Sequence, residues 1–324
     1  MMAENTKQKV KGRFAPTPSG RMHLGNLMCA LLAWLSAKSQ GGTMVLRIED
    51  LDRERSLEKY RTLLIEDLDW LGLSFEEGPG ENGPCAPYDQ SRRYPIYEQD
   101  YRRLLPRIYP CFCSRAALHA ASAPHLSDGR VLYSGACRTL TEQQRKERMR
   151  LRAPACRIAV EDTVIGFTDG VQGWYQASLA QECGDFIVRR ADGVLAYQLA
   201  VVLDDARMGI TQVVRGRDLL SSTPQQIWLY QLLGFSVPEF YHIPLLTDPE
   251  GKRLSKRDLD LDLGILRQTY RSQQLTGMLG YLCGQLPMPQ PITPAELAQR
   301  FDLAKVPRQD IALPSSLLSD LSKL

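Results

Sequence analysis

The chain has 324 residues, of which 44% are hydrophobic and 24% charged, and its formal net charge at pH 7 is +3. This length allows a large core in one main domain with insertions and a smaller tail. The small net charge excludes a uniformly basic surface, so any nucleic-acid contact must be local. The polar residues 1–11 lack a signal-peptide core and the apolar run 27–35 is too short to cross a bilayer. We therefore expect a cytoplasmic protein whose eight cysteines are reduced.

A β-α-β unit is predicted at the start of the chain. Residues 11–15 can end a strand, after which two prolines and Gly20 shape a turn. Leucines then recur at helical spacing from Leu24 to Leu35, and the run 43–48 has strand character. The free N–H groups at such a helix start attract phosphate, and Gly25 lets a ligand approach the backbone. By itself, however, this pattern also fits an ordinary helix start.

Further elements follow in alternation. Helices are predicted over 56–71 and 94–108, and residues 109–190 have the character of an insertion. Two strand-like runs, 186–188 and 194–203, flank the turn residues Ala191-Asp192-Gly193 and predict a hairpin. Another strand is expected over 208–214, a helix over 222–233 and a strand over 241–246. Thr293 begins a capping box, so the tail is expected to be mainly helical.

A basic loop, KRLSKR at 252–257, follows the last predicted strand of this unit. Its Ser255 and Lys256 can reach the phosphates of a nucleotide held at the first helix start, because compact ammonium charges suit phosphate oxygens. A basic loop by itself is more often solvated surface. A second basic segment, Arg138 to Arg157, can contact RNA or can be a solvated helix face.

Three of the eight cysteines are clustered in the insertion, as Cys111-Phe112-Cys113 and Cys137. In a reducing compartment such a cluster indicates metal binding more than a disulfide. A closed tetrahedral zinc site needs a fourth ligand, and His119 and His125 are the chemically obvious candidates.

The order of these motifs resembles that of the class I aminoacyl-tRNA synthetases. RFAPTPSG at 13–20, LRIEDLD at 46–52 and YQLAVVLDD at 197–205 are similar to the glutamyl branch, and the basic loop matches that branch's KMSKS-like loop. Arg253 stands where lysine is common in the family. Tyr133-Ser134-Gly135-Ala136-Cys137 keeps the family's Tyr-x-x-x-Cys spacing, which favours Tyr133 over His125 as the fourth zinc ligand, although the segment between Cys113 and Tyr133 is longer here.

This resemblance implies an α/β fold of the class I synthetase type, with a Rossmann-type nucleotide-binding domain, an inserted zinc-bearing subdomain and a short helical C-terminal region. The expected segments are the first half of the catalytic domain (1–108), the acceptor and zinc-binding insertion (109–190), the second half ending in the KMSKS-like loop (191–257) and the helical tail (258–324).

The resemblance also implies the site residues of an ATP-dependent ligase acting on L-glutamate. The amino-acid pocket would be lined by Arg13, Phe14, Ala15, Pro16, Thr17, Glu49, Tyr197 and Arg215. ATP, with Mg²⁺, would contact His23, Gly25, Asn26, Ser255 and Lys256, of which His23 and Lys256 are the expected catalytic residues. One structural Zn²⁺ would be held by Cys111, Cys113, Tyr133 and Cys137.

The expected acceptor follows from the length of the chain, which leaves little room for the anticodon-reading domain of a full glutamyl-tRNA synthetase. A shortened chain of this kind resembles the glutamyl-Q tRNA(Asp) synthetases, which activate glutamate without tRNA and attach it to the queuosine base of tRNA(Asp). Two alternatives stay open: a truncated glutamyl-tRNA synthetase charging a tRNA 3′ end, and an inactive zinc-bearing RNA-binding relative. No obligate protein partner is indicated.

Overall fold

The computed structural model describes residues 9–80, 83–114, 132–248, 250–251 and 262–314. The predicted β-α-β unit is confirmed: β1 (Lys11–Phe14), α1 (Leu24–Lys38) and β2 (Thr43–Leu46) follow one another. The two strands are parallel, in register from Lys11↔Thr43 to Phe14↔Leu46. The helix is mostly apolar because it is buried against this pair and against a strand from later in the chain.

That later strand belongs to a second parallel pair, β8 (Gln212–Gly216) and β9 (Glu239–Ile243), which α7 (Thr223–Leu232) connects. Two hydrogen bonds bring the pairs together, from Lys11 N to Thr211 Oγ1 and from Thr211 N to Lys11 O, both 2.9 Å. The carboxyl ends of β1 and β8 therefore lie next to each other. In open parallel sheets, ligands bind in the crevice at such a point.

The predicted hairpin over 186–203 is wrong in its second arm. The turn does form, since Arg190 N donates to Val194 O at 2.8 Å, but its pairing is limited to the single bridge Arg189↔Leu195. The chain then enters α6 (Tyr197–Arg207), because its apolar residues also recur at helical spacing. The helix buries Leu199, Val202 and Leu203 in the core beside α7.

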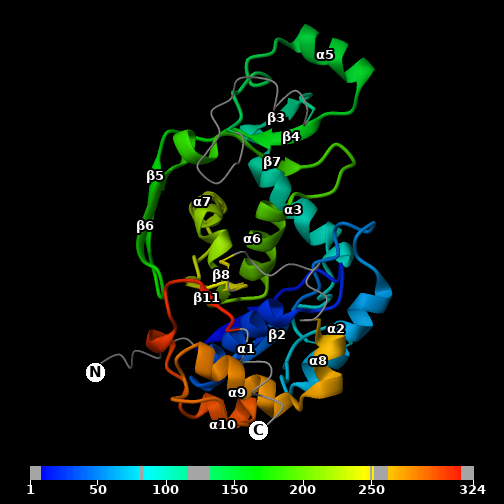
Figure 1. Ribbon diagram of the computed structural model, residues 1–324. Helices are drawn as coiled ribbons and strands as arrows, with labels where there is room; N and C mark the ends of the chain where they lie inside the picture. Colours follow the sequence, from blue (N-terminus) through cyan, green and yellow to red (C-terminus); the bar gives the residue numbers. More distant parts are fainter. Residues whose placement is uncertain (1–8, 81–82, 115–131, 249, 252–261, 315–324) are drawn as a thin grey trace, which may run out of the picture.

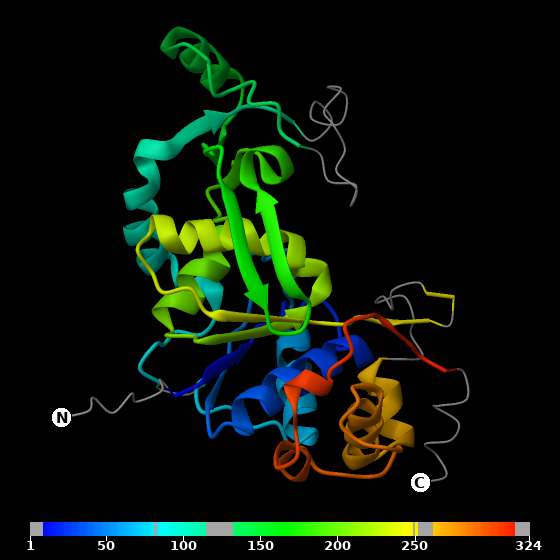
Figure 2. The same ribbon diagram turned by 90° about the vertical axis from the view of Figure 1, so that its left-hand side faces the viewer.

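The insertion forms a separate group of elements at one end of the molecule (Figure 1). Its antiparallel sheet has the order β3 (Ile108–Cys111), β4 (Ala155–Ile158) and β7 (Phe186–Arg189), with the exposed helix α5 (Glu142–Leu151) above it. A hairpin of β5 (Val164–Asp169) and β6 (Gly173–Ser178) runs from there to the parallel strands (Figure 2), where Gly170 N donates to Phe240 O at 2.9 Å. The hairpin thus reaches the strand β9.

The other α-helices of the described residues bury apolar side chains in the core. They are α2 (Glu58–Trp70), α3 (Tyr94–Leu104), α8 (Leu263–Thr269), α9 (Ser272–Leu282) and α10 (Pro294–Ala298). The capping box at Thr293 is present, and the mainly helical tail packs at the end opposite the insertion (Figure 1). The tail also contains β11 (Ile311–Ala312), which pairs in parallel with β10 (Leu246–Thr247).

Two hydrophobic clusters form the main core. One surrounds α1 and includes residues of α9 and α10, and the other surrounds α6 and α7. Within the part of the chain that the structure describes, no helix combines the length and the apolar character needed to span a membrane.

Candidate active site and cysteine cluster

One pocket of about 400 Å³ opens at the carboxyl ends of β1 and β8. Every predicted amino-acid-pocket and ATP-binding residue that the structure describes contributes to its lining, namely Arg13, Phe14, Ala15, Pro16, Thr17, His23, Gly25, Asn26, Glu49, Tyr197 and Arg215. Ser255 and Lys256 lie outside the described residues. Residues separated by up to about 200 positions in the sequence thus meet at one crevice, while their individual roles remain proposals.

The helix start is held by a reciprocal capping box. His23 is the N-cap of α1: its Nδ1 accepts from Gly25 N at 3.1 Å, and its backbone N–H donates to Asn26 Oδ1 at 3.2 Å. Because Nδ1 is an acceptor, neutral His23 carries its proton on Nε2. Gly25 favours this arrangement, since an added Cβ would lie 3.0 Å from the His23 ring carbon Cε1 and the ring would have to shift.

Arg215, at the end of β8, is fixed at two of its three nitrogens. Its Nε donates to His242 Nε2 at 3.0 Å and its Nη2 to Thr223 Oγ1 at 2.8 Å. The third nitrogen, Nη1, is buried and has no hydrogen-bond partner among the described residues. The side chain is 3% exposed, and burial lowers its pKa, although the guanidinium stays charged. A buried N–H group without a partner is costly, so this atom is suited to a ligand oxygen.

A second group of charges lies beside it, around Arg47. This residue is fully buried and donates to Asp205 Oδ1 at 2.5 Å and to Glu49 Oε1 at 3.1 Å. Arg13 Nε lies 3.5 Å from the other oxygen of Asp205, and its Nη1 donates to Val214 O at 3.1 Å. Burial raises the pKa of Glu49, although Arg47 opposes the shift; for Asp205 the arginines outweigh burial and lower the pKa.

The predicted set omits several residues that shape this pocket. Arg47, Asp204 and Asp205 lie in the motifs that carry the resemblance, but nothing local shows that they pair with one another. Asp169 and His242, which lie behind Arg215, carry no sequence motif at all. Arg47 and His242 could have been found as ionisable residues inside predicted strands. Such positions are buried, so an ionisable side chain there needs a hydrogen-bond partner.

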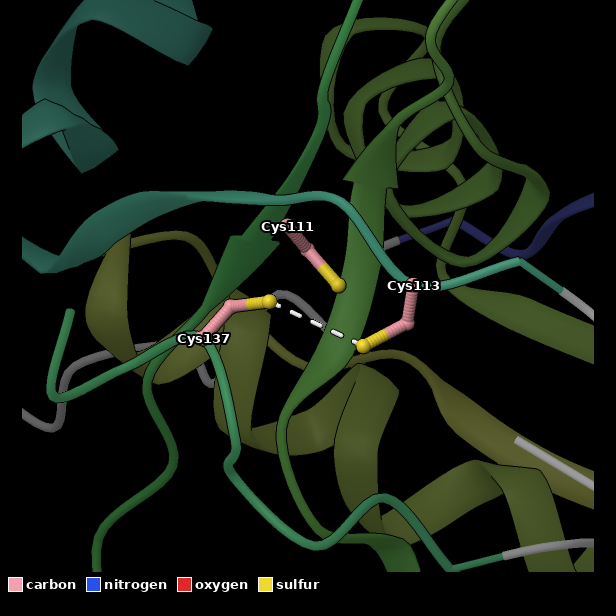
Figure 3. Close-up of side chains that lie close together, drawn as sticks. All are labelled: Cys111, Cys113 and Cys137. Carbon is pink, nitrogen blue, oxygen red and sulfur yellow. Dashed lines mark hydrogen bonds between the residues drawn. The ribbon is translucent and has the colours of Figure 1, made fainter. Parts of the chain in front are cut away.

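The predicted cysteine cluster is present. The three sulfur atoms of Cys111, Cys113 and Cys137 lie within 4.8 Å of one another and point toward a common centre (Figure 3). Tyr133 stands next to them, with its hydroxyl 3.7 Å from Cys111 Sγ and accepting from Cys137 N at 2.7 Å. His119 and His125 lie outside the described residues.

The surroundings of the cluster fit a metal held by thiolates. Three donors point at the sulfurs: Phe112 N to Cys137 at 3.4 Å, Arg148 Nη1 to Cys137 at 3.9 Å and Arg157 Nε to Cys111 at 3.3 Å. Such donors stabilise negative charge on sulfur and orient it, as second-shell groups do in zinc sites. Three thiolate ligands favour a soft or borderline metal ion over hard cations. The cluster can therefore hold a metal ion.

Replacing Cys137 with alanine is expected to abolish binding of one equivalent of zinc, because two thiolates do not retain a structural Zn²⁺. Metal content measured by mass spectrometry checks this, with Cys283→Ala as the matched control, since Cys283 is buried outside the cluster. Tyr133→Phe is expected to lower zinc occupancy. Normal zinc content in Tyr133→Phe, together with loss in His125→Ala, would assign the fourth ligand to His125 instead.

The chain is similar to known proteins over nearly its whole length. The family model for the catalytic domain of class I tRNA synthetases for glutamate and glutamine (E and Q) matches residues 9–279. The glutamyl-Q tRNA(Asp) synthetase of Symbiobacterium thermophilum is 49% identical over 317 residues, covering 96% of this chain and 98% of the relative. That of Nitratidesulfovibrio vulgaris is 45% identical, covering 97% of this chain and 98% of the relative.

A crystal structure of glutamate-tRNA synthetase from Elizabethkingia anophelis has the same fold, with a TM-score of 0.84 and 29% identity. The match covers 97% of this chain but 70% of that one, whereas the glutamyl-Q relatives are matched over nearly their whole length. The chain therefore belongs to the class I synthetases of the glutamyl and glutaminyl type, and within them to the glutamyl-Q tRNA(Asp) synthetase family.

Proposed function

We propose that the protein activates L-glutamate with ATP, in the absence of tRNA, and transfers it to the queuosine base in the anticodon loop of tRNA(Asp). In the first step, the glutamate α-carboxylate attacks the α-phosphate of ATP, and pyrophosphate leaves as glutamyl-adenylate forms. In the second, a queuosine hydroxyl attacks the activated carbonyl, loses its proton and releases AMP. The reaction needs no protein nucleophile, so catalysis consists of positioning and charge stabilisation.

The observation that carries this proposal is the buried Nη1 of Arg215 in a pocket that also holds Arg13 and Glu49. Two guanidinium groups and one carboxylate match the charges of glutamate, which has two carboxylates and an ammonium group. Arg215 and Tyr197 would hold a carboxylate, and Glu49 would accept from the α-ammonium. Glutamine would be rejected, because a neutral amide does not satisfy a desolvated guanidinium.

The phosphate end of the pocket is the start of α1. Backbone N–H groups there, together with the Nε2 proton of neutral His23, would contact the phosphates of ATP. Asn26 caps this end by accepting from His23 N, and Gly25, which has no side chain, would let the phosphates approach the backbone. Lys256 and Ser255 would complete it from the KMSKS-like loop, and Mg²⁺ would accompany ATP and offset the charge of the pyrophosphate.

The cysteine cluster would serve this activity structurally. Zn²⁺ held by Cys111, Cys113, Cys137 and Tyr133 would fasten the strand β3 to the segment before α5, and so stabilise the insertion that faces the RNA. We also keep the four-segment division of the chain, with 109–190 as the acceptor-binding insertion, as part of the proposal. ATP and tRNA are cytoplasmic substrates, which suits a cytoplasmic enzyme.

The test has two stages. Pure protein should catalyse glutamate-dependent ATP–pyrophosphate exchange without RNA, and labelled glutamate should then attach to tRNA(Asp) that contains queuosine but not to tRNA(Asp) that lacks it. The terminal ribose and queuosine both have vicinal diols, so sensitivity to periodate does not distinguish the two acceptors. The nucleotide that carries the label must therefore be mapped. A label on the 3′-terminal nucleotide would show a truncated glutamyl-tRNA synthetase, and absent exchange would show an inactive RNA-binding relative.

Replacing Lys256 with alanine is expected to slow adenylate formation by about a hundredfold or more, comparable with the loss of one oxyanion donor. The reason is that the ammonium group interacts more strongly with the negative charge that develops on the phosphates in the transition state. Single-turnover formation of the adenylate measures the effect. Lys305→Ala, in the tail and outside the pocket, is the control. A Lys256→Ala variant with wild-type exchange would remove this residue from the catalytic set.

A further inference from the structure

We propose that Asp169 and His242 are positioning residues that set the orientation of the Arg215 guanidinium and, through it, the recognition of the substrate carboxylate. The inference rests on the proposed function for the identity of that carboxylate. Its basis is a chain of hydrogen bonds that runs from the hairpin of the insertion through β9 to the pocket. None of the three links has a local signature in the sequence.

The first link fixes the state of the imidazole. Arg215 Nε has a proton and no lone pair, so His242 Nε2, 3.0 Å away, must accept. His242 is therefore neutral, with its proton on Nδ1. That proton points to Asp169 Oδ2 at 2.5 Å. Burial lowers the pKa of His242, although Asp169 opposes the shift, which agrees with a neutral ring. The aspartate thus selects the tautomer that Arg215 requires.

The second link fixes Asp169 itself. The residue ends β5 and is buried, and its Oδ1 accepts from Val171 N at 3.0 Å and from Gln172 N at 2.8 Å. These bonds form the turn between β5 and β6. The same carboxylate accepts from the backbone N–H of His242 at 3.1 and 3.2 Å, so the turn of the hairpin is joined to β9. The carboxylate has little freedom to move.

The third link gives the consequence for the pocket. Because Nε is held by His242 and Nη2 by Thr223, the plane of the guanidinium is determined, and Nη1 is the nitrogen left for a ligand. Thr223 Oγ1 also lies 3.0 Å from His242 Nε2. The ring of Phe240 stacks on the imidazole at an interplanar angle of 13°, and Phe167 packs against both rings. This enclosure keeps water from replacing the bonds.

Asp169→Asn is the sharpest test, because it changes the hydrogen-bonding pattern with almost no change in shape. The asparagine oxygen would keep the hydrogen bonds from the backbone N–H groups of Val171 and Gln172. Its NH₂ group would then face His242. An NH₂ donor there favours the tautomer with the proton on Nε2, and that proton opposes the Arg215 N–H. We expect the KM for glutamate in ATP–pyrophosphate exchange to rise about tenfold or more, with the KM for ATP and kcat changed little.

Asp100→Asn is the matched control. Asp100 is also a buried aspartate that binds an arginine, Arg207, at 2.9 and 2.6 Å, but it lies outside the pocket. A double-mutant cycle with His242→Ala then separates positioning from general packing. If Asp169 acts through His242, Asp169→Asn does not raise the glutamate KM further in the His242→Ala background. An unchanged glutamate KM in Asp169→Asn, or full additivity in the double variant, overturns the inference.

A measurement on the wild-type protein covers the case in which these variants do not fold. Nitrogen NMR of the imidazoles distinguishes the tautomers, and the chain has only four histidines. His242 can be assigned by elimination, with single replacements of His23, His119 and His125. The proton is expected on Nδ1, and a proton on Nε2 or a charged ring overturns the inference. Absent exchange in the wild type would instead refute the proposed function and leave this hydrogen-bond chain as a structural feature.

Discussion

Replacing Arg215 with methionine is expected to lower kcat/KM for glutamate in ATP–pyrophosphate exchange by about a thousandfold, or about 4 kcal/mol, as for truncating one partner of a buried charge pair. The variant removes the only nitrogen of this side chain that lacks a partner among the described residues, Nη1, and leaves the substrate carboxylate desolvated beside apolar atoms. Methionine fills a similar volume, so most of the loss should appear as weaker binding of glutamate. The KM for ATP should change little.

Arg207→Met is the matched control for this prediction. Arg207 is also an arginine bound to an aspartate, Asp100, but it is on the outer side of α6 and does not line the pocket. Its exchange kinetics should stay within a few-fold of wild type, because Arg207 lies outside the pocket and Asp100 keeps Arg103 as a partner. A similar loss of glutamate activity in both variants would mean that Arg215 acts through stability alone. A normal glutamate KM in Arg215→Met would place the substrate carboxylate elsewhere, with Arg13 as the next candidate.

Replacing Arg47 with methionine is expected to lower the free energy of unfolding by about 3–5 kcal/mol, the usual effect of removing one partner of a buried ionic group. Arg47 is fully buried and lies within 4 Å of three acidic side chains: Glu49, Asp204 and Asp205. Without it, Asp205 would depend on Arg13, and Asp204 on Arg93, for compensation of its charge. Urea unfolding followed by circular dichroism gives the free energy.

Arg102→Met provides the comparison for this second prediction. Arg102 lies 3.8 Å from Glu98 on an exposed face of α3, and its side chain is 73% exposed. This substitution should change the free energy of unfolding by less than about 1 kcal/mol. A similarly small change in Arg47→Met would show that the buried acids take up protons or rearrange at little cost. Exchange activity of Arg47→Met should also fall, because Glu49 loses the donor that holds it.

Much of the catalytic half could be predicted because its signals are local. The strand, proline-glycine turn and helix start of residues 11–38 follow from residue types and spacing, and the capping box at His23 is formed by residues three apart. The three cysteines were also recognisable, since Cys111 and Cys113 are near neighbours and Cys137 completes a known spacing. The strand predicted over 194–203 is wrong because tertiary packing, and not local propensity, decides that α6 forms there. Val201 and Val202 favour strands by propensity, but packing against α7 buries them equally well as a helix.

The β-α-β unit at the start of the chain, the turn before its helix and the cysteine cluster could be predicted from the sequence, because these features depend on residues that are neighbours along the chain. Which charged side chains meet depends on the packing of distant segments. Asp169 and His242 are 73 residues apart, and Arg47 and Asp205 are 158 apart. Hydrogen bonds act over about 3 Å and depend on direction. Such pairs therefore form only when strand pairing and helix packing have placed both partners, and no local pattern records that placement.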